Sequence, residues 1–278
     1  MAILTHGSDL SLSPALGPLV RGAGQASGAV RAAVEQLARQ GFASVQLDAT
    51  LPGLRPRELS SRGRRDLLAL LGRRNVRPSG LDLFIPRKHY ADDAQMDRAV
   101  AATVAAIELA RDLGRLPVSL GLPVKRLPEP VQTAIVEAAD GQGVRLAVHA
   151  EDQLDALEQW VDAIGLPSVG VGLDPAALLA RGHDPAAVAQ RLGHRLAVAR
   201  LSDVDRAADG DDDEEAGAGE TVRCPAGAGE LDLIPYRVAV DLAGRRAGPV
   251  VLDLRGLARP FDAAAVGKRA WDDAAFTV

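Results

Sequence analysis

One unit repeats along this sequence and limits what the chain can fold into: a stretch with helical periodicity, followed by a short apolar run. Residues 28–40 place Val30, Val34 and Leu37 on one helical face, Gly41 follows as a stop, and residues 43–49 resemble a strand. Strands that alternate with helices at this spacing predict βαβ units and a parallel sheet. Further helix-periodic stretches occupy residues 57–75, 93–113, 129–140, 152–163, 175–192, 231–243 and 262–275.

Seven strands can be located by pattern, and the first is expected within the N-terminal 25 residues without a definite position. Eight such units in 278 residues favour a closed (β/α)8 barrel over an open doubly wound sheet. A dinucleotide-binding sheet would need G-x-G-x-x-G directly after its first strand, and no convincing strand precedes the glycine-rich stretch at 22–28. We therefore predict an α/β protein with a single (β/α)8 barrel over residues 1–278.

Composition excludes several classes of protein. A net charge of −5 without a basic stripe disfavours nucleic-acid binding. The single cysteine, Cys224, rules out an intrachain disulfide and is interpreted as an ordinary loop residue that suits a reducing compartment. The N-terminal stretch lacks the charged and apolar regions of a signal peptide, and no apolar run approaches the ~18 residues of a membrane span. A cytoplasmic protein without a membrane contact is expected, and the oligomeric state is left open.

Residues 205–223 differ from the rest of the chain, because they are acidic, rich in Gly and Ala and without periodicity. We expect a flexible loop after the seventh strand. Its acidic run lacks the ligand spacing of a calcium-binding loop, so calcium is not expected there.

Strand parity predicts a ring of polar side chains inside the barrel, at the carboxyl ends of its strands. In barrels of this type, active sites lie at that end. Burying several charges together is costly unless they are paired or bind something, so we expect a binding site, with a purely structural ion-pair network as the alternative. The inward-facing residues are Gln46, Asp48, Asp82, Ser119, His149, Glu151, Asp174, Arg200, Ser202, Asp253 and Arg255.

The order and spacing of several segments carry a family resemblance. These are QGFASVQLDA at 40–49, AIELARDLG at 106–114, GVRLAVHAED at 143–152, VGVGLDPAALLARGHDP at 169–185, RLAVARLSD at 195–203 and CPAGAGELDLIPY at 224–236. Over residues 28 to about 258 the chain resembles the xylose-isomerase-like barrel group of sugar-phosphate isomerases and epimerases. The resemblance implies a (β/α)8 barrel that isomerises, epimerises or dehydrates a small sugar derivative.

The resemblance also implies a divalent metal (Mn, Mg, Zn or Co) held by Glu, Asp, His and Glu on the last four strands. The corresponding residues here are His149, Asp174, Arg200 and Asp253. A guanidinium offers no lone pair to a metal and carries a fixed positive charge. We therefore expect Arg200 to take the place of the cation and to pair with Asp174 and Asp253, so that no cofactor is needed. If a metal does bind, His149, Asp174 and Asp253 are its expected ligands.

Two classes of function remain open at this point. If the chain is an enzyme, His149, Glu151 and Asp253 are its candidate catalytic residues and move protons beside a carbonyl of a sugar-like ligand. The candidate substrate-binding residues are Arg200, Gln46, Asp48, Asp174, Arg255 and, as a phosphate contact, Lys125. The alternative is a non-catalytic barrel that binds a metabolite or a protein partner, favoured by the loss of both glutamates. An endonuclease of the same fold is disfavoured by the scarcity of histidines.

Overall fold

A computed structural model describes residues 10–22, 28–205, 222–243 and 248–275. Its main sheet has eight parallel strands in the order β1, β10, β7, β6, β5, β4, β3, β2, and an isolated parallel bridge between Ala15 and Gln46 joins the two ends. The predicted (β/α)8 barrel is therefore confirmed. The strands are β1 (Leu12–Pro14), β2 (Ser44–Asp48), β3 (Arg77–Leu83), β4 (Val118–Gly121), β5 (Leu146–His149), β6 (Val169–Leu173), β7 (Leu196–Leu201) and β10 (Val250–Leu252).

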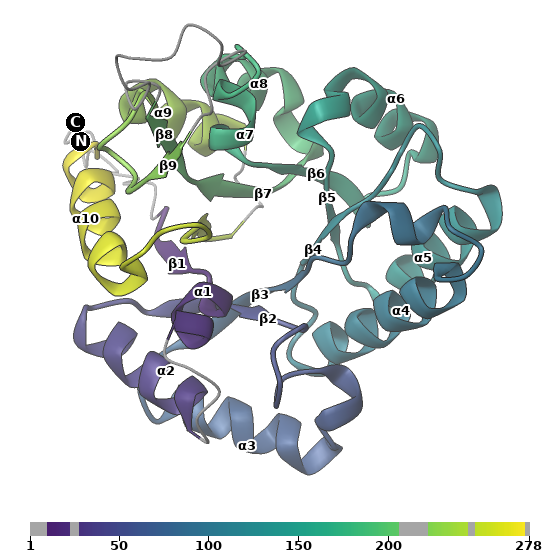
Figure 1. Ribbon diagram of the computed structural model, residues 1–278, viewed down its shortest axis with the longest axis horizontal. Helices are drawn as coiled ribbons and strands as arrows, with labels where there is room; N and C mark the ends of the chain where they lie inside the picture. Colours follow the sequence, from purple (N-terminus) through teal and green to yellow (C-terminus); the bar gives the residue numbers. More distant parts are fainter. Residues whose placement is uncertain (1–9, 23–27, 206–221, 244–247, 276–278) are drawn as a thin grey trace, which may run out of the picture.

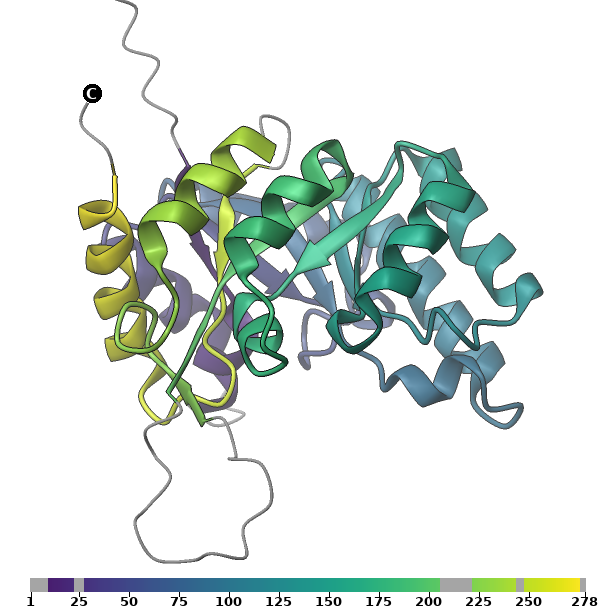
Figure 2. The same ribbon diagram turned by 90° about the horizontal axis from the view of Figure 1, so that it is seen from above.

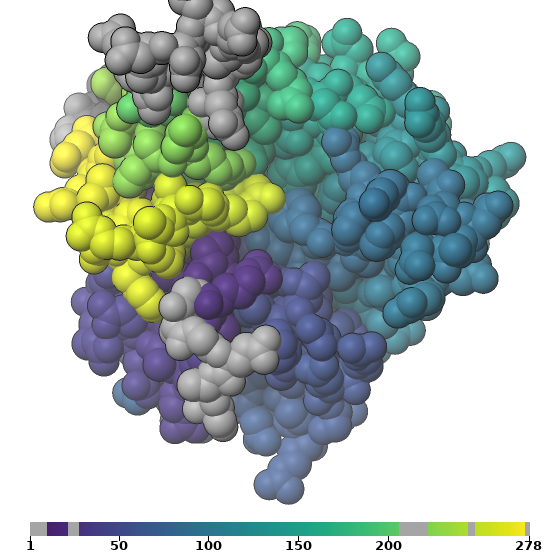
Figure 3. Space-filling view, viewed as in Figure 1, coloured from purple at the N-terminus to yellow at the C-terminus, as the bar shows by residue number. Residues whose placement is uncertain are grey.

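Helices surround the strands on the outside (Figure 1), and Figure 2 shows the same arrangement from above. In the space-filling view the purple N-terminal part lies beside the yellow C-terminal part, as the pairing of β1 with β10 requires (Figure 3). The α-helices are α1 (Leu16–Gly22), α2 (Ala29–Arg39), α3 (Ser61–Gly72), α4 (Met96–Asp112), α5 (Glu129–Gln142), α6 (Leu154–Ile164), α7 (Pro175–Leu179), α8 (Pro185–Leu192), α9 (Leu233–Ala243) and α10 (Pro260–Asp273). Short 3-10 helices are η1 (Pro56–Glu58), η2 (Arg87–Tyr90), η3 (Glu151–Gln153) and η4 (Gly193–Arg195).

The amphipathic stretches bury the faces that their periodicity predicts. Helix α2 buries Val34 and Leu37 completely against the sheet. The side chain of Ser60 caps α3 by accepting from the Gly63 N–H, which satisfies one of the free amide groups at a helix start. The alternation along β5 also holds, because Leu146 and Val148 belong to the main apolar core.

The structure corrects two boundaries. The stretch at 175–192 forms two helices, α7 and α8, because Gly182 adopts a left-handed φ of 74° and Asp184 caps a new helix that begins at Pro185. The prediction of a loop over the whole of 205–223 was wrong at its ends, where β8 (Asp203–Asp205) pairs antiparallel with β9 (Val222–Cys224). Residues 206–221 of that prediction lie outside the described residues.

Small apolar residues fill part of the barrel interior. A separate apolar cluster of Ala15, Ala147, Ala197, Val198 and Val251 joins β5 to the segments around β1, β7 and β10, so its members meet through the barrel centre. Alanine and valine leave room above them for longer polar side chains at the carboxyl ends of the strands. Among the described residues, no helix is long and apolar enough to cross a membrane.

Candidate functional site

Arg200 of β7 lies inside the barrel with 0% of its side chain exposed. Its Nη2 donates to Asp82 Oδ1 at 2.5 Å, and its Nη1 lies 3.4 Å from Asp253 Oδ2. The Gln46 side-chain amide also donates to Asp82, at 2.9 Å, and the Phe84 ring centroid lies 5.1 Å from the Arg200 guanidinium carbon. A permanent cation therefore occupies the barrel interior and is held by carboxylates from two strands.

Two further arginines lie beside Arg200. Arg223 Nη2 lies 2.5 Å from Asp174 Oδ2, and Arg223 Nη1 lies 3.3 Å from Asp253 Oδ2. Arg255 donates to Asp174 from Nη2 at 3.0 Å and to both oxygens of Asp253 from Nε at 2.9 Å. The expected pairing of Arg200 with Asp253 is confirmed. Its expected pairing with Asp174 was wrong, because Arg223 and Arg255 supply the guanidiniums that contact Asp174.

This packing keeps the carboxylates ionised. Burial alone raises the pKa of Asp253, but the charges of Arg255, Arg200 and Arg223 outweigh burial and hold that pKa far below its ordinary value. The pKa of Asp174 is lowered in the same way: burial opposes ionisation, and Arg223 and Arg255 overcome it. Arg200, Arg223 and Arg255 face Asp82, Asp174 and Asp253, so the buried charges balance without a further cation.

The residues that the resemblance places at metal-ligand positions do not form a ligand set for a divalent cation. Arg200 presents only hydrogen-bond donors, and the oxygens of Asp174 and Asp253 that would face a cation accept from guanidiniums. Across the described ranges, no group of three or more His, Cys, Asp or Glu side chains is placed to hold a metal ion.

His149 and Glu151 form an ordered pair at the end of β5. His149 Nδ1 lies 2.8 Å from Glu151 Oε1, which also accepts from the Asp174 backbone N–H at 3.1 Å. A carboxylate only accepts, so Nδ1 carries the hydrogen, and in a neutral imidazole Nε2 then presents its lone pair. That Nε2 is buried and has no hydrogen-bond partner among the described residues. Gly172 makes room for the ring, since a Cβ there would overlap the imidazole.

A cavity of about 190 Å³ opens beside this pair. Arg255 lines it, and Arg255 Nη1 makes no hydrogen bond to the residues that the structure describes, whereas Nε and Nη2 hold Asp253. The same small space is therefore lined by an imidazole and by a guanidinium, each with a nitrogen that has no hydrogen-bond partner among the described residues. Its lining residues are Phe84, Ile85, Arg87, Gly121, His149, Glu151, Asp174 and Arg255.

The other predicted site residues lie at different places around the ring. Asp48 Oδ2 accepts from Arg21 at 2.8 Å and its Oδ1 accepts from Thr50, so Asp48 is held away from the cavity lining. Gln46 contacts the cavity only indirectly, through Asp82 and Arg200. Lys125 lies in the loop after β4 and lines a neighbouring cavity instead.

The sequence pattern missed several residues of the site, among them Arg223 and Phe84. Arg223 lies in the acidic segment that was interpreted as a loop, and its place in the site follows from the pairing of β8 with β9, which periodicity does not reveal. Phe84 follows β3, and its ring lies 5.1 Å from the guanidinium carbon of Arg200 and 4.6 Å from that of Arg255. The parity of β3 placed Asp82 and Phe84 on the same face, which was the available signal for Phe84.

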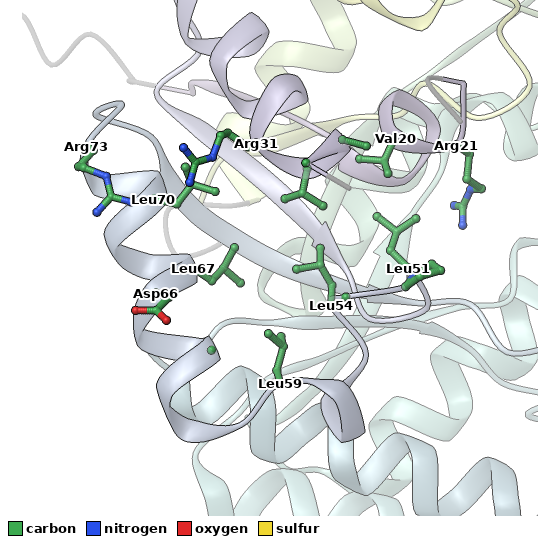
Figure 4. Close-up of a pocket in the computed structure, with 16 residues that line it drawn as sticks. Val20, Arg21, Arg31, Leu51, Leu54, Leu59, Asp66, Leu67, Leu70 and Arg73 are labelled. Atoms are coloured by element: carbon green, nitrogen blue, oxygen red, sulfur yellow. The ribbon is translucent and has the colours of Figure 1, made fainter. Parts of the chain in front are cut away.

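A larger cavity, of about 710 Å³, lies among α1, α2, α3 and the loop after β2. Figure 4 shows leucines along its length, with Arg21 at one end and Arg31 and Arg73 at the other. It holds no histidine, and its one carboxylate, Asp66, lies at the surface. We therefore place the chemistry at the smaller polar cavity, where titratable groups converge.

Comparison with known proteins agrees with this architecture. The family model described as xylose isomerase-like TIM barrel matches residues 34–255, and the chain belongs to that family. Its fold is similar to a Mycobacterium smegmatis xylose isomerase-like protein crystallised with magnesium (TM-score 0.69, 14% identity, 96% of this chain and 98% of that chain). It is also similar to IOLI protein with a bound zinc atom (TM-score 0.68, 15% identity, 96% of this chain and 100% of that chain). A third structure with a similar fold is D-psicose 3-epimerase from Clostridium cellulolyticum H10 with D-tagatose (TM-score 0.65, 13% identity, 88% of this chain and 90% of that chain). A search of curated protein sequences found no significant match.

Proposed function

We propose that this protein catalyses proton transfer at a carbon beside the carbonyl of a small sugar, as an isomerase or epimerase that uses side chains in place of a metal. The observation that carries the proposal is the buried Nε2 of His149, which has no hydrogen-bond partner among the described residues and belongs to a side chain that Glu151 orients and that lines a cavity together with Arg255. The family membership and the similarity to an epimerase crystallised with D-tagatose support the substrate class.

In the proposed reaction, His149 Nε2 removes the proton from the carbon next to the carbonyl. Glu151 holds the Nδ1–H and stabilises the imidazolium that forms. Negative charge then develops on the carbonyl oxygen, and the Nη1 group of Arg255 donates hydrogen bonds to it. Return of the proton to carbon completes the exchange and leaves His149 neutral.

Asp253 has a positioning role in this proposal. Its carboxylate contacts three guanidiniums and its pKa is far below the ordinary value, so it is a poor proton acceptor at neutral pH. It fixes the plane of the Arg255 guanidinium through Nε and Nη2. Asp174 contributes in the same way through Nη2.

The test is solvent-deuterium incorporation. Sugars, sugar phosphates and inositols are screened by thermal shift, and hits are incubated with EDTA-treated protein in D2O and followed by NMR. We expect exchange at the carbon beside the carbonyl, its loss by at least about 100-fold in His149→Gln, and no change in the control His183→Gln, an exposed residue. Exchange that survives in His149→Gln would refute the assignment.

The second candidate is a barrel that binds such a ligand without converting it. The observation that favours it is that arginines already donate hydrogen bonds to Asp174 and Asp253. Among the described residues that line the cavity, His149 and Glu151 are then left as the acid–base groups without an arginine partner. Ligand binding in the thermal-shift screen, without deuterium exchange in any hit, would support this candidate and contradict catalysis.

A further inference from the structure

A bidentate ion pair crosses the carboxyl end of the barrel next to the proposed catalytic cavity. Arg87 of η2, which follows β3, donates from Nη1 and Nη2 to the two carboxylate oxygens of Asp152 at 2.5 and 2.9 Å. Asp152 lies in η3, which follows β5, and β4 lies between β3 and β5 in the sheet. The pair therefore joins segments that follow two strands that are not neighbours in the barrel.

Gly121, the last residue of β4, provides the room for this pair. A Cβ at that position would come within 3.2 Å of Arg87 Cγ and 3.4 Å of Arg87 Cδ, so the aliphatic stem of Arg87 packs closely against the glycine. Gly121 in turn pairs in register with His149 of β5. The stem of Arg87 thus crosses the strand end beside the proposed base, and both side chains line the same cavity.

Neighbouring groups hold this Arg87–Asp152 bridge in place. Gln153 Nε2 donates to Asp152 Oδ2 at 3.2 Å, and Gln153 Oε1 accepts from the Lys125 N–H at 3.4 Å. The hydrogen bond between Arg87 and Asp152 lowers the pKa of the carboxyl and raises that of the guanidinium, so both groups are charged at neutral pH. Their side chains are 36% and 31% exposed, so the bridge can open without unfolding of the core.

The cavity that Arg87 helps to enclose is small. Its volume of about 190 Å³ is below the roughly 300–1,000 Å³ of cavities that enclose drug-sized ligands. At roughly 30 Å³ per water it holds about six waters, close to the number of non-hydrogen atoms in a three-carbon sugar and about half the number in a six-carbon sugar. Arg87 also lines the cavity of about 640 Å³ that Lys125 lines, so its side chain is part of the wall of both. Shortening this side chain would leave more room beside His149.

We infer that Arg87 is a specificity-determining residue: while Asp152 holds it, Arg87 limits the substrate to a short sugar of about three or four carbons. A six-carbon sugar is then too large for the native cavity. The inference rests on the proposed function for the kind of substrate, whereas the closing of the cavity by Arg87 can be measured without any substrate.

The first experiment measures how readily a small reagent reaches His149. Diethyl pyrocarbonate modifies neutral imidazoles, and Nε2 of His149 is the ring nitrogen without a partner among the described residues. The full chain is treated at about pH 8, above the ordinary pKa of histidine, and modification of His149 is followed by peptide mass spectrometry. We expect Arg87→Ala and Asp152→Ala each to speed this modification by about fivefold or more, because each removes the ion pair that keeps the cavity closed.

The matched control is Arg74→Ala, which breaks an ion pair with Glu35 between the end of α3 and α2. It should leave the rate at the buried imidazole within about twofold of the native rate. The exposed His183 and His194 serve as internal standards, and circular dichroism checks that each variant is folded. A native rate in either variant of the Arg87–Asp152 bridge, or an equal rise in the control, would overturn the inference.

The second experiment tests substrate length by solvent-deuterium exchange with dihydroxyacetone, erythrulose and D-fructose, which are ketoses of three, four and six carbons. We expect the native chain to exchange the two shorter ketoses at least about tenfold faster than D-fructose, and Arg87→Ala to narrow that ratio to within about threefold. Equal exchange of all three by the native chain would overturn the inference. Exchange into none of them would refute the proposed function for ketoses, and the reaction of His149 with diethyl pyrocarbonate would still decide whether Arg87 closes the cavity.

Discussion

Replacement of Arg200 by methionine should destabilise the barrel by about 3–5 kcal/mol, the usual cost of leaving a buried ion without its partner. The loss is concentrated at Asp82. That carboxylate accepts from Arg200 and Gln46 and makes no other ion pair among the described residues, whereas Asp253 keeps Arg255 and Arg223. Methionine matches much of the arginine stem, so the change removes charge and hydrogen bonds more than it removes volume.

The assay is urea unfolding followed by circular dichroism, with a thermal melt beside it. For a chain of this size, a loss of 3–5 kcal/mol lowers Tm by roughly 6–20 °C. Adding Asp82→Asn to Arg200→Met removes the orphaned charge and should recover about half of the loss or more. The control Arg191→Met breaks a surface pair with Glu158 and should cost less than about 1 kcal/mol.

Two results would refute this reasoning. A loss below about 1 kcal/mol for Arg200→Met would mean that the buried cation is not needed to balance the ring. Failure of Asp82→Asn to improve Arg200→Met would mean that the lost stability comes from packing and not from the uncompensated carboxylate.

Three further predictions concern the site and the hairpin beside it. Gly172→Ala places a methyl group against the His149 ring and should abolish deuterium exchange, and a fully active variant would contradict the proposed position of the imidazole. Burial, with nearby carboxylates, raises the pKa of Cys224 to about 11, so its alkylation rate should keep rising up to that pH, and a plateau near pH 9 would contradict this. The lowered pKa values of Asp174 and Asp253 stabilise the fold above about pH 4, and this contribution is lost as the pH falls towards the native-state values. Urea unfolding midpoints measured from pH 7 to 3 should fall steeply at the acidic end, and a flat profile would contradict this contribution of Asp174 and Asp253 to stability.

The barrel could be predicted from the sequence because its strands and helices carry strong periodic signals. Val34 and Leu37 on α2, and the alternation in β5, lie where the pattern placed them. The first strand could not be located, because β1 spans only Leu12–Pro14 and three residues are too few for a periodic signal. The division between α7 and α8 depends on a left-handed glycine and on a cap, and the long periodic stretch concealed both.

Parity predicted which polar side chains form the ring inside the barrel, but not which of them pair with each other. Parity gave Arg200 an inward direction, and the resemblance placed it among metal-ligand positions. Neither parity nor the resemblance could show that Arg200 pairs with Asp82, which lies 118 residues earlier in the chain. Neither could show that Arg223, and not Arg200, pairs with Asp174. Such pairings depend on side-chain length and on how far each strand rises in the barrel, which one-dimensional periodicity does not contain.

We propose that the guanidiniums of Arg200, Arg223 and Arg255 lie where the resemblance places a metal ion and supply its positive charge. The most direct measurement is elemental analysis of the purified protein, followed by calorimetric titration with Mn, Zn and Mg after EDTA treatment. The structure predicts less than about 0.1 equivalent of metal and no saturable binding, because Arg200, Arg223 and Arg255 already neutralise Asp82, Asp174 and Asp253. One equivalent of tightly bound metal, removed by EDTA with a large fall in Tm, would contradict it.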